Sequence, residues 1–295
     1  MIVFIQQLLN GLQLGSIYAL VALGYTMVYG IVKLINFAHG EIIMVGAYVA
    51  YFTVPTLRDW GVPIWLSMFI AAIFCAILGV MIEVVAYRPL RKAPKLCSII
   101  TAIGMSLFLQ NLAQLLWKPD PRPFPQVISR EPVVIGGVST SWNAIITIVV
   151  SLGLMVLMQI FVKKTKSGRS MRCVSEDMGA AKLMGINVNR TVSLTFAIGS
   201  ALAAIGAVFY ANSYPRITPT MGSLMGLKAF IAAVLGGIGV IPGAILGGII
   251  MGVAETLTKG YISSQLADAV VFGILIIVLL VKPSGLLGKK ARVKV

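Results

Sequence analysis

The stretch "NGLQLGSIYALVALGYTMVYGIVKLINFAHGE", residues 10–41, contains the pattern that decides the fold. Its first part belongs to an apolar run, residues 8–32, that is long enough to cross a bilayer, because a hydrocarbon core about 30 Å thick needs roughly 20 apolar residues in a helix. Polar or small residues then interrupt the run before apolar sequence resumes: Asn36, His39, Gly40 and Glu41. The stretch predicts a membrane-spanning helix followed by a break.

The rest of the chain has the same apolar character. Of its 295 residues, 58% are hydrophobic and only 11% are charged, whereas soluble domains carry about 25% charged residues. Every backbone amide in hydrocarbon must be paired within its own segment, so the spanning elements are helices. We therefore predict an all-α polytopic membrane protein with one transmembrane domain over residues 1–295.

Apolar runs of bilayer length recur along the chain. The clearest are residues 8–32, 62–86, 97–117, 143–162, 192–213 and 266–281, and residues 40–54 form a shorter run. A further run, residues 226–255, is too long for one straight helix and contains "GGIGVIPG" at 236–243, where glycines allow any backbone angle and Pro242 lacks an N–H. We expect two half-helices there, and about eight to nine membrane helices in all, including this broken or re-entrant pair.

The basic residues orient these helices. The net charge of +15 could indicate nucleic-acid binding, but sixteen of the 24 Lys and Arg residues gather in short segments at 88–95, 163–190 and 282–294. Such clusters mark the cytoplasmic side of a membrane. The order of the helices then puts the N-terminus outside, the C-terminus in the cytoplasm, a Pro-rich extracytoplasmic loop at 118–142 and a cytoplasmic loop at 163–190. The expected surroundings are a lipid bilayer, with no nucleic-acid partner.

Both breaks are candidates for the translocation path or its gate, because irregular backbone at membrane depth occurs where protein or a watery cavity covers it. His39 and Glu41 form either a solvated cytoplasmic turn or part of the path, and we favour a structural turn that adjoins the path, since charge hinders neutral solutes. Gln110 and Asn111, within the span at 97–117, could make interhelical hydrogen bonds or line a cavity. The candidate residues are Asn36, His39, Gly40, Glu41, Gln110, Asn111, Gly236, Gly237, Gly239 and Pro242.

Other residues have simpler structural interpretations. Glu83 and Glu255 are near helix ends, where we expect snorkelling or a Lys or Arg partner. Pairs of glycines four residues apart predict close packing of helices. These pairs are Gly11 and Gly15, Gly243 and Gly247, and Gly248 and Gly252.

The sequence does not indicate an enzyme. The sole histidine, His39, lies in no nucleophile motif, no cluster of metal ligands occurs, and the phosphate-binding pattern G-x-x-x-x-G-K-[ST] is absent. We expect no catalytic residue, metal or cofactor in this chain. An ion-coupled secondary transporter stays open as an alternative, because broken helices are typical of that class.

An amphipathic segment in the basic loop predicts a protein partner. "EDMGAAKLMGI", residues 176–186, reads as a short helix with Ser175 as its N-cap, acids in the first turn and Gly185 as its C-cap. Its apolar patch is small and its start is acidic, which favours docking into a groove on a protein over lying on lipid. The residues expected to make this contact are Glu176, Asp177, Ala180, Ala181, Met184, Gly185 and Ile186.

The same segment resembles the cytoplasmic coupling motif of bacterial ABC importer permeases, in which two alanines and a glycine four residues after the second meet the ATPase subunit. Ala180, Ala181 and Gly185 match that spacing, although Gly179 stands where the motif has an acid. Residues 10–41 closely resemble the N-terminal region of the branched-chain amino acid permease family. "LKAFIAAVLGGIGVIPGAILGG", residues 227–248, occupies the place of that family's second signature.

The resemblance covers nearly the whole chain and implies an inner-membrane permease subunit without a fused ATPase. It implies a second permease subunit in a heterodimer, two cytoplasmic ATP-binding subunits, and a periplasmic binding protein that delivers leucine, isoleucine or valine. ATP-driven closure of the ATPase pair would push residues 176–186 and switch the cavity between outward and inward access. Urea and short-amide permeases resemble the same family, so these solutes remain an alternative.

Overall fold

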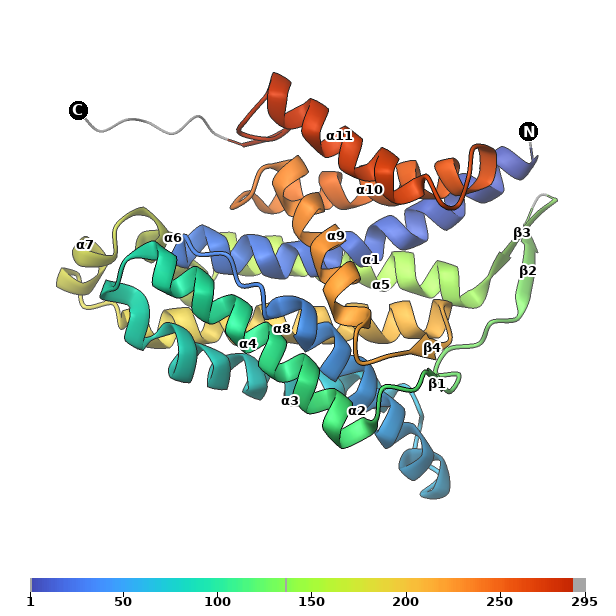
Figure 1. Cartoon of the computed structure of the whole chain (residues 1–295), viewed down its shortest axis with the longest axis horizontal. Coiled ribbons are helices and arrows are strands. Elements are labelled where there is room, and N and C mark those ends of the chain that lie inside the picture. Colours follow the sequence, from blue (N-terminus) through green and yellow to red (C-terminus); the bar gives the residue numbers. More distant parts are fainter. Residues whose placement is uncertain (1, 136, 289–295) are drawn as a thin grey trace.

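The computed structural model describes residues 2–135 and 137–288, which form a bundle of helices with most long axes in one direction (Figure 1). The helices are α1 (Ile2–Val32), α2 (His39–Asp59), α3 (Leu66–Ile82), α4 (Lys95–Trp117), α5 (Trp142–Lys164), α6 (Lys166–Glu176), α7 (Met178–Leu183), α8 (Val188–Ser213), α9 (Met221–Gly236), α10 (Ile241–Tyr261) and α11 (Ala267–Val281). A π-helical turn, Glu83–Tyr87, and a 3₁₀ turn, Pro89–Lys92, follow α3.

Seven helices within the described residues are long and apolar enough to cross a membrane: α1, α2, α3 with its π turn, α4, α5, α8 and α10. Five of them match the predicted runs at 8–32, 62–86, 97–117, 143–162 and 192–213. The predicted run at 266–281 is instead α11, which has 15 residues and is shorter than these spans. The predicted short span at 40–54 extends through Pro55 to Asp59. The proline is in the last turns of α2, where its missing N–H removes one hydrogen bond without ending the helix.

The predicted pair of half-helices is unequal. α10 has 21 residues, whereas α9 has 16, which at 1.5 Å per residue is about 24 Å, short of a bilayer core of about 30 Å. α9 lies across the long helices in Figure 1 and is steeply inclined to them. The break itself is where the sequence predicts it, although α10 already begins at Ile241 and includes Pro242 in its first turn.

The α6–α7 segment and the loops around the strands lie at opposite ends of the bundle. Figure 1 shows α6 and α7 at one end, and the start of α1 with the β2–β3 hairpin at the other. α11 runs from the hairpin end toward the α6–α7 end. Part of the basic tail used for orientation, Lys289, Lys290, Arg292 and Lys294, lies outside the described residues.

The fold is mostly helical, as predicted, but four short strands also form, which the all-α prediction did not include. Residues 118–142 contain β2 (Pro132–Ile135) paired antiparallel with β3 (Val138–Ser141), and β1 (Arg122–Pro123) pairs with β4 (Arg216–Ile217). β-branched residues in both strands favour the hairpin, and Gly137 has a φ of +83° that suits a turn. The structure is thus mostly helical, with short strands at one end.

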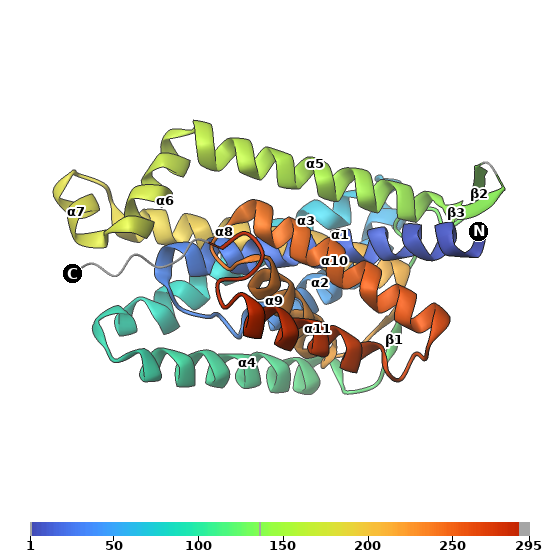
Figure 2. The same cartoon turned by 90° about the horizontal axis from the view of Figure 1, so that it is seen from above.

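α1 is the central helix of the bundle. It packs against α10, α8, α9 and α5, and its residues from Leu14 to Val28 are all buried. α4 and α5 run along opposite edges in Figure 2 and bury far less of their surface. α1 therefore forms the core, and the edge helices leave apolar side chains for lipid or a partner.

The glycine pairs bring α1 and α10 into backbone contact. A Cβ added at Gly15 would lie 2.8 Å from the Cα of Ile249, and one at Gly11 would lie 2.8 Å from the Cα of Val253. Cβ atoms added at Gly248 and Gly252 would meet the backbone of Ala19 and Gly15. The predicted close packing is confirmed, since no larger residue fits at these contacts.

The two carboxylates at helix ends have the expected basic partners. Arg88 Nη2 lies 2.7 Å from Glu83 Oε2, Arg91 also pairs with Glu83, and Ser193 of α8 donates to the same carboxylate at 2.7 Å. The hydrogen bond with this carboxylate raises the pKa of the Arg88 guanidinium above its ordinary value.

Glu255 of α10 is buried and joins α10 to two other helices. Its Oε1 lies 2.8 Å from Lys228 Nζ of α9 and 2.6 Å from Lys259 Nζ, and its Oε2 accepts from Tyr18 Oη of α1 at 2.9 Å. Lys228 also pairs with Asp268 of α11 at 2.6 Å. These charges are fully paired, as buried charges must be to be tolerated.

The α1–α10 contact predicts the effect of one added methyl group. Gly252→Ala places a Cβ against the backbone of Gly15, and we expect such overpacking to destabilise the protein by on the order of 3 kcal/mol. Thermal unfolding in detergent should show a lower midpoint. The matched control is Gly153→Ala in α5, where an added Cβ has open space and alanine is the better helix former by about 1 kcal/mol. Equal midpoints for the two variants would contradict this account.

Candidate functional site

The first break lies inside the bundle, not in a solvated turn. α1 ends near the α6–α7 end, residues 33–38 run back along the bundle, and α2 begins at depth (Figure 1). Asn36 and His39 are 2% and 1% exposed. Asn36 Oδ1 accepts from Tyr87 Oη at 2.9 Å, and the His39 ring meets the Tyr25 ring edge-on at 4.4 Å between centroids. Of the alternatives for His39 and Glu41, the solvated turn does not fit, because neighbouring helices cover both side chains. The favoured interpretation, a structural turn that adjoins the path, stays a prediction.

Glycines allow α2 to begin against α9. A Cβ added at Gly40 would lie 2.7 Å from the carbonyl oxygen of Gly222, and one at Gly226 would overlap the backbone of Gly40. Glu41, the next residue of α2, is 1% exposed, and its Oε1 accepts from Ser223 of α9 at 3.0 Å and from Ser106 of α4 at 3.2 Å. The break thus joins three helices through one carboxylate.

Gln110 and Asn111 of α4 both make hydrogen bonds within the bundle. Gln110 donates from Nε2 to Ser223 Oγ at 3.4 Å, an interhelical bond, while Asn111 donates from Nδ2 to the Leu107 carbonyl of its own helix at 2.7 Å. The contact of Gln110 supports interhelical hydrogen bonding over cavity lining, whereas Asn111 bonds only within its own helix.

The second break is closed by the segment that follows α11. Gly237 and Gly239 have φ values of +106° and +92°, so the turn needs glycine at both places. The amides of Leu286 and Leu287 donate at 2.9 Å to the carbonyls of Leu235 and Gly236, which satisfies acceptors that the end of α9 would leave unpaired. Gly236 also lies against Gly243, with no space for a side chain between them.

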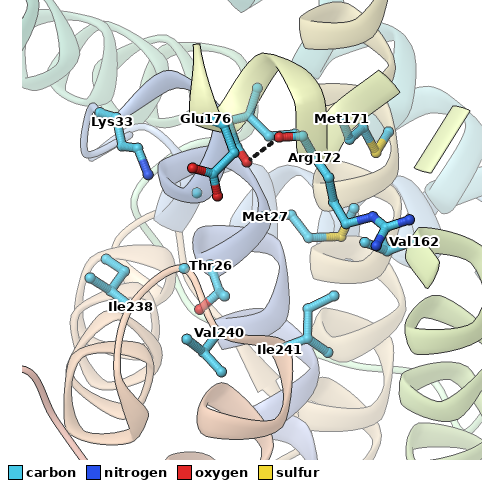
Figure 3. Close-up of a pocket in the computed structure, with 14 residues that line it drawn as sticks. Thr26, Met27, Lys33, Val162, Met171, Arg172, Glu176, Ile238, Val240 and Ile241 are labelled. Carbon is cyan, nitrogen blue, oxygen red and sulfur yellow. Dashed lines mark hydrogen bonds between the residues drawn. The ribbon is translucent and has the colours of Figure 1, made fainter. Parts of the chain in front are cut away.

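A cavity of about 330 Å³ joins this break to α6 (Figure 3). Ile238, Gly239, Val240 and Ile241 line one side, and Thr26, Met27, Gly30 and Ile31 of α1 line the centre. Met171, Arg172, Ser175 and Glu176 of α6 close the side opposite the break, as Figure 3 shows. The turn between α9 and α10 and α6 therefore share one cavity, which the predicted coupling segment reaches through its first residue, Glu176. Gly40 and Glu41 of the first break line a different cavity.

α6 is fixed to the end of α5. A Cβ added at Gly168 would overlap the backbone of Phe161 and Val162, and Met171 and Val174 are buried on the same side. Thr165 caps α6 by accepting from the amide of Gly168 at 3.0 Å. The sequence analysis missed this helix because its polar composition resembles a loop.

The N-cap prediction was wrong in its residue. Ser175 lies within α6 and donates to the Arg172 carbonyl at 2.7 Å, and Glu176 is the last residue of α6. Asp177 is the N-cap of α7, and its Oδ1 accepts from the amides of Gly179 at 2.7 Å and Ala180 at 3.0 Å. Serine and aspartate are both good N-caps, so the local pattern alone could not choose between them.

The predicted C-terminus of the coupling helix is confirmed. Gly185 has a φ of +79°, its amide donates to the Lys182 carbonyl at 3.1 Å, and the Ile186 amide donates to the Ala181 carbonyl at 3.0 Å. This is a Schellman motif, in which glycine takes the left-handed position at no steric cost. α7 is thus a short helix with defined ends.

The outer face of α7 is apolar and open. Leu183 is 91% exposed and Met184 is 83% exposed, while Ala181 is buried at 3%. Ala180 and Gly185 are exposed and Ile186 is half-buried. The sequence analysis identified Met184 but missed Leu183, although an apolar pair directly before a C-terminal glycine is a usable signal. This surface can bind an apolar groove on another protein.

Comparison with known proteins identifies the family. A family model described as "Branched-chain amino acid transport system / permease component" matches residues 7–280. The chain is 46% identical over 296 residues to the high-affinity branched-chain amino acid transport system permease protein LivH of Salmonella typhimurium, covering 97% of this chain and 96% of that protein. It is 45% identical to LivH of Escherichia coli K12 and to BraD of Pseudomonas aeruginosa, with the same coverage. The chain is therefore a member of the branched-chain amino acid transport system permease family, whose members are membrane transport components and not enzymes.

Proposed function

We propose that this chain is the membrane-spanning permease of a binding-protein-dependent ABC importer that carries leucine, isoleucine and valine. The observation that carries the proposal is the exposed apolar face of α7, Leu183 and Met184, held between two defined helix ends. A permease without its own ATP site needs such a surface to receive force from separate ATPase subunits. The relatives named above favour branched-chain amino acids over urea, short amides or an ion-coupled mechanism.

The charge pattern supports an orientation of the chain in the membrane. The α6–α7 end, rich in Lys and Arg, faces the cytoplasm, and the hairpin end with the start of α1 faces outward. Residues 163–190 then form the cytoplasmic coupling loop and residues 118–142 the extracytoplasmic loop, in a bacterial inner membrane. Two ATP-binding subunits, a second permease subunit and a periplasmic binding protein complete the importer.

The proposed mechanism links α7 to the second break. Closure of the ATPase pair would push residues 176–186, and α6 would move with α5 because Gly168 leaves no gap between them. The cavity of about 330 Å³ between α6 and Ile238–Ile241 gives this motion room and a direction. Alternating access would follow as the turn between α9 and α10 shifts against α1.

Co-purification tests the assembly and the substrate. The tagged chain, extracted in mild detergent from its native host, should bring two ATPases, a second permease and a periplasmic binding protein, identified by mass spectrometry. Titration of that binding protein should show affinity for leucine and none for urea. Recovery of the chain alone, with gradient-driven uptake in proteoliposomes, would overturn the proposal.

A substitution at Gly185 should uncouple the importer. Gly185→Glu places a charged side chain at a position with φ of +79° on the docking surface, and we expect loss of ATPase assembly and uptake with membrane insertion intact. The matched control is Gly61→Glu, because Gly61 has φ of +67° and equally open surroundings in the α2–α3 turn at the other end of the bundle. Both variants carry similar backbone strain. Normal uptake by Gly185→Glu, or equal loss in both, would contradict a docking role.

Leu183 should be an energetic centre of the same interface. Leu183→Asp is expected to weaken ATPase binding by at least about 2 kcal/mol, roughly 30-fold, because a charge would replace a buried apolar anchor. The control is Val134→Asp in β2, since Val134 is 69% exposed at the hairpin end. Affinity can be measured by titrating labelled ATPase subunits onto the permease in nanodiscs. Unchanged affinity for the Leu183 variant would place the interface elsewhere.

A further inference from the structure

A second cavity, of about 250 Å³, lies between α4 and α9 at the start of α2. Its volume is close to the lower end of ligand pockets, about 300 Å³. Glu41 forms its polar side with Ser106 and Ser223, and Phe37, Leu107 and Phe230 form much of its apolar side. The cavity therefore combines one acidic group with an aliphatic and aromatic wall.

Glu41 is unusual among the carboxylates of the bundle. Glu83 and Glu255 each have basic partners, but Glu41 takes part in none of the ion pairs among the described residues. Two serine hydroxyls donate to its Oε1, and its Oε2 is buried without a hydrogen-bond partner in the described part of the chain. Buried charge of this kind is costly, so an unpaired carboxylate within a membrane protein indicates a partner that arrives from outside.

The position of Glu41 keeps it ready to accept a cation. It lies in the first turn of α2, where the positive end of the helix dipole favours the ionised carboxylate. α2 begins at a break inside the bundle, and discontinuous helices form the substrate sites of many transporters. An incoming ammonium group would take the place of a serine hydroxyl at Oε1, or reach Oε2 after rotation of the side chain.

We infer that Glu41 binds the ammonium group of an aliphatic amino acid in transit, while Phe37, Leu107 and Phe230 contact its side chain. This inference rests on the proposed function and names the recognition site for its substrate. It also revises the expectation that a charge would only hinder passage, because a zwitterion brings its own positive group. Urea has no such group and would gain nothing from Glu41.

Competition with bound leucine tests whether the site recognises the ammonium group or the carboxylate of the amino acid. Radiolabelled leucine is bound to the complete complex in nanodiscs without the binding protein, in ATP-free and vanadate-trapped forms. Isopentylamine keeps the ammonium group and the side chain of leucine, and 4-methylpentanoate keeps the carboxylate and the side chain. We expect isopentylamine to compete at least tenfold better than 4-methylpentanoate, with no competition by urea or by sodium ions. Equal competition by the two analogues, displacement by sodium, or no leucine binding in either form would overturn the inference.

Variants assign the effect to the carboxylate. Glu41→Gln keeps the size of the side chain and the acceptor for Ser106 and Ser223, and we expect at least tenfold weaker leucine binding with the complex intact by size-exclusion chromatography. Glu131→Gln, an exposed carboxylate on the loop before β2, should bind leucine normally. Should Glu41→Gln disrupt the complex, Leu107→Trp provides a second variant, because it fills the cavity from a side chain that is 53% exposed, and it should also weaken binding at least tenfold. Wild-type affinity in Glu41→Gln, or in Leu107→Trp as the substitute, would overturn the inference.

Uptake separates this inference from the proposed function. Proteoliposomes with the binding protein should import leucine with the wild-type complex and far more slowly with Glu41→Gln. Normal uptake by both refutes the role of Glu41 and leaves the proposed function standing. Absence of branched-chain amino acid uptake by the wild type refutes the proposed function. If leucine still binds to that complex, the competition between isopentylamine and 4-methylpentanoate decides whether Glu41 binds an ammonium group, and if leucine does not bind, the inference fails as well.

Discussion

Close contact between backbones, made possible by glycine, is the constraint on which the bundle depends. Lipid is as apolar as the side chains it surrounds, so helices in a membrane gain little from hiding apolar surface and associate through tight packing. In this chain the contacts are made at glycines that face one another across helix pairs: Gly15 and Gly252, Gly24 and Gly199, Gly40 and Gly222, and Gly236 and Gly243. Each pair sets the distance between two segments. Together these contacts place α1 at the centre of the bundle, with both breaks close to it.

The same packing allows the chain to interrupt its helices without exposing polar backbone to lipid. At the second break the segment after α11 supplies donors for Leu235 and Gly236. At the first, α2 begins against the backbone of α9, and Tyr87 reaches Asn36. Irregular backbone within a membrane has to be covered in this way, and the cover necessarily comes from residues far away in the sequence.

Features that depend on nearby residues could be predicted from the sequence, whereas features that depend on residues far apart in the chain could not. The spans, both breaks, the glycine contacts of α1 and α10 and the C-terminal glycine of α7 all follow from local patterns, because each depends on residues within a few turns of one another. The depth of the first break in the bundle does not follow from the local sequence, because Asn36 and His39 could equally belong to a solvated turn or to a buried one. Ser106 and Ser223 could not be assigned to Glu41 for the same reason: α4 and α9 meet there only in the folded chain. α6 was missed because its polar side chains obscure the few buried positions, Met171 and Val174, that hold it to α5 and the bundle.

The two breaks have different surroundings, and we propose different tasks for them. The second break shares a cavity with α6, so in the proposed mechanism it responds to movement of the α6–α7 segment. The lining of this cavity includes the charged residues Lys33, Arg172 and Glu176 beside apolar side chains, but no buried unpaired carboxylate. The first break holds such a carboxylate beside an apolar wall, which suits recognition more than movement. α9 connects them, since its first turns contact Gly40 and its last residue begins the turn to α10. In the proposed mechanism α9, a helix of 16 residues, links the proposed recognition site to the turn before α10, so a displacement at one break would be passed to the other unless α9 bends.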